Sequence, residues 1–246
     1  MVFTDKGFVI KKNDLLNDDK VVQLFLQDHG KISAVAKGAK KFTSRKAGNL
    51  ELLQFCKFGI ATGKNLDIIT EIVSIDPFLH IREQESLIYF LFYVDEVIYK
   101  MVYDGEINLD LFDLLNEVLP YIDEHPGSDR KKVASYLNAK ALVFSGVFPE
   151  LFVCVKCGRK IEEDEEKVFL LSGLAHKSCT SGKEISNAAI KALRYLMEGT
   201  LEKYLMINME ESVEDTILSL TIDLIEYTIG SSIRSKSYLY GKSSDK

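Results

Sequence analysis

The hydrophobic pattern of this 246-residue chain changes its period once, at Asp76-Pro77. Before that point, short runs rich in β-branched and aromatic residues alternate with turn residues, which is typical of β-strands. After it, apolar residues recur at spacings of three and four, which is typical of buried helices. We therefore expect an α+β protein in which a β part is followed by a helical part.

The β part contains five runs that we interpret as strands, one led by Phe8-Val9-Ile10 and four more over residues 21–27, 32–36, 52–60 and 66–75. The second and third runs flank Asp28-His29-Gly30, a turn whose glycine can adopt a positive φ. Five short strands within 80 residues predict a small closed barrel. A five-stranded β-barrel of this size is most often an oligonucleotide-binding (OB) fold.

The helical part contains five periodic segments, over residues 86–103, 108–121, 128–147, 187–198 and 213–229. Ser128 and Ser186 are suitable N-caps for the third and fourth segments. A stretch rich in cysteine, glycine and charged residues, 154–182, interrupts the α-helical bundle. It shows neither the alternation of a strand nor the three-and-four spacing of a helix. The expected domains are an OB-fold over 1–79, a helical domain in two parts over 80–152 and 183–246, and an inserted zinc knuckle over 153–182.

The inserted stretch contains two ligand pairs of equal spacing, Cys154-Val-Lys-Cys157 and His176-Lys-Ser-Cys179. Two such pairs are typical of a closed structural Cys3His zinc site. A redox Cys-x-x-Cys would leave His176 and Cys179 unexplained, and an iron–sulfur cluster would favour four cysteines. We predict one structural Zn²⁺ bound by Cys154, Cys157, His176 and Cys179. The acidic run 162–166 is interpreted as a solvated hairpin tip.

Charge is distributed unevenly along a chain whose net charge is −6. The first 80 residues carry more Lys and Arg than Asp and Glu, whereas residues 81–153 are strongly acidic. The segment 31–46 holds no acid, and its cations are predicted to contact nucleic-acid phosphates: Lys31, Lys37, Lys40, Lys41, Arg45 and Lys46. The alternative is a lysine-rich loop that its charge keeps soluble. Arg234 and Lys236 lie in a tail that either adds phosphate contacts or is a frayed end.

No arrangement of residues in the sequence resembles an active site. His29, His80 and His125 have no paired carboxylate or nucleophile at a recognisable spacing, so we expect no enzyme. Phe42 and Phe55 either stack on bases or belong to the core. The most hydrophobic stretch, 87–102, is interrupted by charges and cannot span a bilayer, which favours an intracellular protein without membrane contact.

The sequence resembles a known family over nearly its whole length, most specifically at residues 30–55. Gly30-Lys-Ile-Ser-Ala-Val-Ala-Lys-Gly-Ala-Lys-Lys-Phe-Thr-Ser-Arg45, followed by Gly48-Asn-Leu-Glu-Leu-Leu-Gln-Phe55, is similar to the N-terminal signature of the bacterial RecO family of recombination mediators. The order of parts also agrees: a basic barrel, a helical bundle with an inserted zinc knuckle, and a C-terminal stretch, 233–239.

The resemblance implies a cytoplasmic DNA repair protein of the RecF pathway. Such a protein binds single- and double-stranded DNA, anneals complementary strands, and partners RecR and the acidic tail of single-stranded DNA-binding protein to help load RecA. The resemblance places Lys37, Lys40, Lys41 and Arg45 on phosphates, and it places His176 at a zinc position where cysteine is more usual. The competing interpretation is a protein–protein scaffold with a structural zinc site that does not bind DNA.

Overall fold

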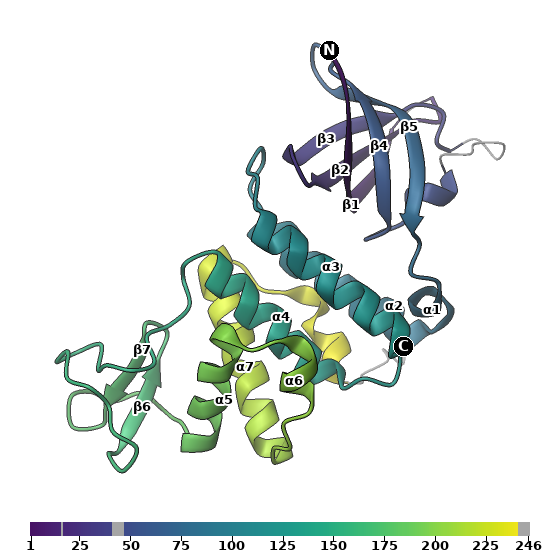
Figure 1. Cartoon of the computed structure of the whole chain (residues 1–246). Coiled ribbons are helices and arrows are strands. Elements are labelled where there is room, and N and C mark those ends of the chain that lie inside the picture. The colour runs from purple at the N-terminus through teal and green to yellow at the C-terminus, as the bar shows by residue number, and fades with distance from the viewer. Residues whose placement is uncertain (16, 41–46, 241–246) are drawn as a thin grey trace. The chain divides into compact units, whose positions relative to one another are not determined.

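The computed structural model describes residues 1–15, 17–40 and 47–240 (Figure 1). The chain forms two compact units. One comprises residues 1–126 together with the C-terminal segment that begins at Ser235, and the other comprises residues 127–234. The division at Gly127 falls inside the range 80–152, which the sequence pattern treats as one helical part.

Five strands form a closed barrel in the order β1-β2-β3-β5-β4. They are β1 (Val2–Asp14), β2 (Lys20–Leu26), β3 (Gly30–Ala36), β4 (Phe55–Ala61) and β5 (Asp67–Asp76). The β3–β5 pair is parallel and closes the barrel, while the other neighbours are antiparallel. A register shift between Val9 and Lys11 marks a bulge in β1, which lets this long strand bend and pair with both β2 and β4. The predicted five-stranded OB-fold is confirmed.

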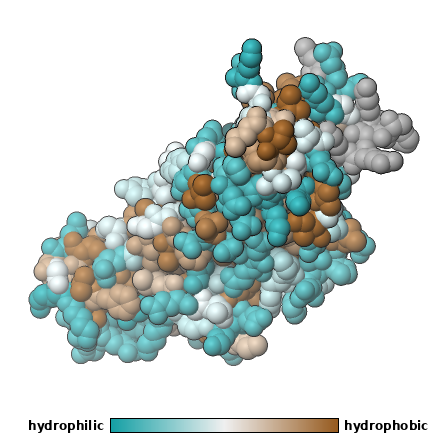
Figure 2. All heavy atoms as spheres, turned by 45° about the horizontal axis from the view of Figure 1, so that its top comes forward, coloured by the Kyte–Doolittle hydropathy of each residue, from teal (hydrophilic) through white to brown (hydrophobic). Residues whose placement is uncertain are grey.

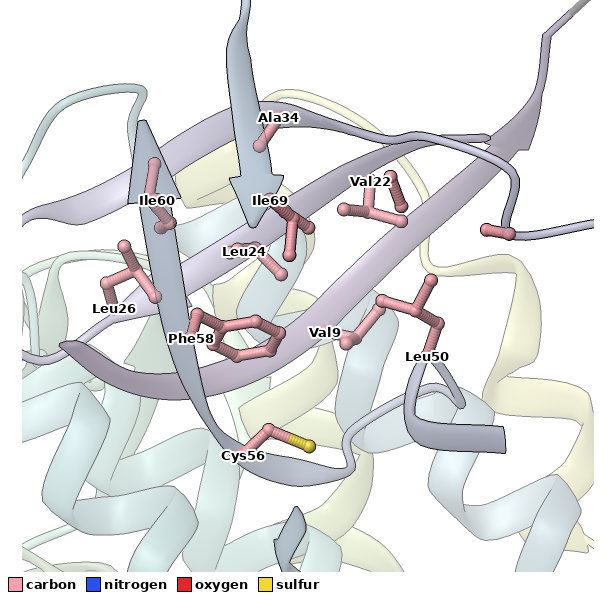
Figure 3. Packing of buried hydrophobic residues seen from close by; sticks show 12 residues of the cluster. Val9, Val22, Leu24, Leu26, Ala34, Leu50, Cys56, Phe58, Ile60 and Ile69 are labelled. Atoms are coloured by element: carbon pink, nitrogen blue, oxygen red, sulfur yellow. The ribbon is translucent and has the colours of Figure 1, made fainter. Parts of the chain in front are cut away.

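Apolar side chains from the strands fill the barrel interior. Figure 3 shows Val9, Leu24, Phe58 and Ile69 turned toward one another, and each is fully buried. Cys56 is also fully buried, and this burial raises the pKa of its thiol to about 11, so it is the small hydrophobic residue that a strand position favours.

The helices of the first unit are α1 (Leu79–Glu83), α2 (Glu85–Met101) and α3 (Leu109–Glu124). Phe112 of α3 packs against the outer face of β1 and β2, because its ring lies 5.3 Å from that of Phe8 and 5.6 Å from that of Phe25, whose strand neighbours Val9 and Leu24 face the barrel interior. Phe55 stacks on Phe8 at 4.9 Å and is half-buried, so its ring packs against the same aromatic cluster. Phe42 lies outside the described residues.

The C-terminal segment η2 (Arg234–Tyr240) is a 3₁₀ helix whose residues from Ser235 onward belong to the first unit. The amide and the hydroxyl of Ser235 donate to the Glu96 carboxylate of α2 at 2.8 and 2.6 Å. The ring of Tyr238 stacks on that of Tyr89 at 4.8 Å. These contacts hold the segment against α2, in contrast to a frayed end.

The second unit contains α4 (Arg130–Phe144), α5 (Asn187–Glu198), α6 (Leu201–Leu205) and α7 (Glu211–Ile229). Helix α4 packs against the other three (Figure 1). Ser186 caps α5 as predicted, since its hydroxyl accepts from the Ala189 amide at 3.2 Å. The N-cap of α4 is Asp129, whereas the sequence favoured Ser128, because the Asp129 carboxylate reaches the amides of two residues of the first turn.

A small three-stranded sheet in the order β7-β6-β8 interrupts this bundle. Its strands are β6 (Lys167–Leu170), β7 (Gly173–His176) and β8 (Lys183–Glu184). Within the described ranges, every helix is too short or too polar to cross a membrane. On the face shown in Figure 2, hydrophobic residues form separate patches among hydrophilic ones.

Candidate metal centre and nucleic-acid interface

Two backbone turns bring the four metal-ligand candidates together. In the first turn, the Gly158 amide donates to the Cys154 carbonyl at 2.8 Å. Gly158 has a φ of 73°, a left-handed conformation that glycine adopts without steric cost. The second turn follows β7, where the Cys179 amide donates to the His176 carbonyl at 2.9 Å. The ligand pairs are therefore positioned by the backbone itself.

The donor atoms of Cys154, Cys157, His176 and Cys179 all lie within 4.8 Å of one another. The Nδ1 of His176 lies 3.4 Å from the Cys157 sulfur and 3.9 Å from the Cys179 sulfur. Cys154 and His176 are buried, while the other two cysteines are exposed. This group could hold one metal ion with four ligands from the protein.

The electrostatic surroundings of the cysteines differ. Burial acts to raise the pKa of Cys154, but backbone groups of Cys157, His176 and Lys156 outweigh it and lower that pKa to about 6. Hydrogen bonds from the backbone and the guanidinium of Arg159 lower the pKa of Cys157. Burial and the neighbouring thiols raise the pKa of Cys179. Two of the three sulfurs thus favour the thiolate, the form that binds metals.

The other ring nitrogen of His176 has a carboxylate partner, because its Nε2 lies 3.0 Å from Oε2 of Glu165. The same oxygen accepts from the Glu162 amide at 3.0 Å, and this bond lowers the pKa of Glu165. The acidic run 162–166 is therefore more than the solvated tip that the sequence suggests. No regular spacing links Glu165 to His176, so only the density of acids near the ligands could have pointed to it.

Three cations of the basic segment 31–46 are described. Two of them are exposed, and the third, Lys31, is buried. Lys37 and Lys40 are exposed. The Lys40 ammonium donates to the Leu15 carbonyl at 3.2 Å and lies 3.8 Å from the Asp14 carboxylate. In the C-terminal segment, Arg234 is exposed and Lys236 is half-buried. The remaining predicted DNA contacts lie outside the described residues: Lys41, Arg45 and Lys46.

Lys31 is placed differently from the sequence prediction. Its side chain is 9% exposed, and its ammonium donates to the carbonyls of Tyr99 and Val102, both at 3.1 Å. It also lies 3.4 Å from the Asp104 carboxylate and 4.2 Å from the centre of the Tyr99 ring. The last carbonyls of a helix have no partner within the helix, and a cation satisfies them well. Lys31 therefore caps α2, and we remove it from the proposed DNA contacts.

Two family profiles together span almost the whole chain. The profile described as "Recombination protein O N terminal" matches residues 1–78, and "Recombination protein O C terminal" matches residues 83–237. The chain belongs to the RecO family. This confirms the resemblance seen in residues 30–55.

Curated relatives of this RecO-family chain are named DNA repair protein RecO. The relative from Dehalococcoides mccartyi is 31% identical over 214 residues, which cover 85% of this chain and 84% of the relative. The relative from Desulforamulus reducens is 26% identical over 238 residues, or 95% of this chain and 92% of the relative. That from Clostridium acetobutylicum is 25% identical over 221 residues, or 89% of each.

In this RecO-family chain, polar side chains of α5 contact the inserted stretch 154–182 and the residues just before it. Both Nε and a terminal nitrogen of Arg194 donate to the Leu151 carbonyl, at 3.1 and 2.6 Å, and its guanidinium lies 4.7 Å from the centre of the Phe152 ring. The Lys191 ammonium lies 2.6 Å from the Glu163 carboxylate. The sequence pattern singled out none of these side chains, since an exposed basic residue on a helix is common without such a contact.

Proposed function

We propose that this chain is a recombination mediator of the RecF pathway that acts in the bacterial cytoplasm and performs no bond chemistry. It binds single- and double-stranded DNA, anneals complementary strands, and with RecR helps load RecA onto DNA coated with single-stranded DNA-binding protein. The observation that carries the proposal is the closed OB barrel with a cation-rich segment, in a chain matched by both RecO profiles.

The proposed mechanism is electrostatic. Cations such as Lys37 and Lys40 neutralise phosphates on two strands and reduce the repulsion that opposes their pairing, while base complementarity alone reads the sequence. Each phosphate contact on single-stranded DNA contributes about 0.7 to the slope of log affinity against log salt. With Lys31 removed from the set, five cations of 31–46 remain, so the segment accounts for a slope of up to about −3.5.

Zinc is the metal that we propose for the Cys3His group. Tetrahedral Zn²⁺ with sulfur at about 2.3 Å and nitrogen at about 2.05 Å places those ligand atoms about 3.6 Å apart. The Nδ1 to sulfur distances of 3.4 and 3.9 Å fit this geometry. All four positions come from protein, so the metal would stabilise the inserted stretch and leave no open site for catalysis. Elemental analysis of protein purified without added metal tests this, and less than half an equivalent of zinc argues against it.

A binding assay tests the proposal against the scaffold alternative. The full chain is titrated onto labelled single- and double-stranded oligonucleotides at low and moderate salt, and we expect retention that falls as salt rises. Absence of binding at low salt would instead favour a scaffold whose working surface is the acidic helical part.

A second assay tests the mediator role and its partners. Complementary strands coated with single-stranded DNA-binding protein are mixed with the chain, and the coating protein is used with and without its acidic C-terminal tail. We expect annealing that is faster with the tail present. Equal rates would remove the tail from the proposed partners and leave DNA binding intact.

A further inference from the structure

We infer that Glu165 is the positioning residue of the metal site: it holds the His176 ring so that Nδ1 faces the three sulfurs, and it strengthens that nitrogen as a ligand. This inference rests on the proposed Zn²⁺ site. It assigns a task to an acidic run that neither the ligand spacing nor the proposed DNA binding uses.

The geometry determines the roles of the two ring nitrogens. Nδ1 lies 3.4 Å from the Cys157 sulfur, whereas Nε2 lies 3.0 Å from the Glu165 carboxylate on the opposite side of the ring. A carboxylate only accepts hydrogen bonds, so Nε2 carries the proton and donates a hydrogen bond to Glu165. Nδ1 is then left with the lone pair that a metal requires.

The carboxylate is itself held in place. The oxygen that contacts His176 also accepts from the backbone amide of Glu162, at 3.0 Å. Two residues before Glu165, the Glu163 carbonyl accepts from the Asn187 side chain at 3.0 Å, and the Glu163 carboxylate contacts Lys191 of α5. The turn that carries Glu165 is therefore fastened to α5, and His176 is only 3% exposed.

The charge of the site explains why a carboxylate is useful here. A neutral histidine in place of a fourth thiolate makes the metal site less negative by one charge. A hydrogen bond to a carboxylate increases the electron density on the ligating nitrogen, and such outer partners typically change metal affinity by about 10–100-fold. Glu165 thus supplies part of the negative charge that a fourth cysteine would have supplied.

The test measures Zn²⁺ affinity of the full chain by competition with a chromophoric chelator. We expect Glu165→Ala to weaken Zn²⁺ binding by about 10–100-fold. Glu165→Gln should recover part of this loss, because its amide oxygen can accept the same hydrogen bond. Glu166→Ala is the matched control, since Glu166 is the next residue, its side chain is 80% exposed, and among the described residues its carboxylate pairs with Lys177, at 3.7 Å. Its affinity should stay within about two-fold of wild type.

A second set of variants, made in the His176→Cys background, distinguishes positioning of the His176 ring from a general effect of the Glu165 charge on the metal site. In His176→Cys the fourth ligand has no N–H, so adding Glu165→Ala should change Zn²⁺ affinity by less than about two-fold. Equal losses in Glu165→Ala and Glu166→Ala, or a loss that persists with Cys at 176, would overturn the inference. Failure of the wild-type chain to bind Zn²⁺ would instead overturn the proposed metal site. Far-ultraviolet circular dichroism of each variant checks that the helices are retained.

Discussion

Two lysines of the same basic segment should respond to substitution in opposite ways. Lys37 is exposed, and among the described residues no carboxylate lies within ion-pair distance of it. Lys31, six positions earlier, is buried and directs its ammonium at the C-terminal end of α2. We predict that Lys37→Ala changes DNA binding without changing stability, and that Lys31→Met changes stability without changing the salt dependence of DNA binding.

The size of each effect follows from the contacts. On single-stranded DNA, loss of one phosphate contact should flatten the slope of log affinity against log salt by about 0.7. Lys31→Met keeps most of the side-chain volume but leaves the carbonyls of Tyr99 and Val102 without their charged donor. Hydrogen bonds from a charged group contribute about 1.5–3 kcal/mol each, and part of this is recovered from water at the 9% exposed site. A loss of about 2–3 kcal/mol in unfolding free energy is therefore expected.

The assay combines fluorescence anisotropy with a labelled oligonucleotide, from about 50 to 200 mM salt, and denaturant unfolding of the same preparations. Binding is measured well below the melting temperature of the less stable variant. An unchanged slope in Lys37→Ala would remove that residue from the DNA interface. A slope flattened by Lys31→Met at unaltered stability would show that this ammonium reaches a phosphate and would contradict its assignment as a helix cap.

Three further predictions concern the interior and the metal. Phe112→Ala should destabilise the first unit by about 3–5 kcal/mol, because three aromatic rings lose their shared neighbour. A loss below about 1 kcal/mol in denaturant unfolding would show that these rings pack without it. Burial and the nearby Glu96 raise the pKa of Asp95 well above its usual range, so the wild type should lose stability relative to Asp95→Asn as pH rises above about 4. Parallel stability curves of the two proteins between pH 4 and pH 8 would contradict this. If the proposed Zn²⁺ is bound, its removal by a chelator should increase amide exchange in 154–182 and leave α4 protected, as followed by hydrogen exchange.

Features set by local chemistry could be predicted from the sequence. The positive φ of Gly30 and the cap of α5 by Ser186 depend on a few neighbouring residues, and both are confirmed. The extent of β1 was underestimated, because Gly7 to Ile10 is buried on both faces and breaks the alternation that marks a strand. The small sheet β7-β6-β8 was also missed. Its strands are two to four residues long, which is too short for a period to emerge.

The sites were harder to predict, because the role of a charged side chain depends on which groups the fold places next to it. Lys31 and Lys37 are chemically identical in the sequence, but the α2–α3 connection reaches β3, as the bridge between Lys31 and Asp104 shows.

Glu165 differs from the neighbouring Glu166 in that one of its oxygens meets the ring of His176 and the amide of Glu162. The number of charged residues in a sequence segment therefore gives only an upper limit on the number of cations that face DNA or of acids that face solvent. Two more barrel lysines pair with carboxylates, since Lys12 lies 2.6 Å from Glu51 and Lys20 lies 3.7 Å from Asp14. This pairing further reduces the number of barrel cations that can face DNA. The electrostatic field that a DNA strand meets is set by the cations that remain after such internal pairing, and for this reason Lys37 is the most informative of the described lysines of 31–46 to substitute.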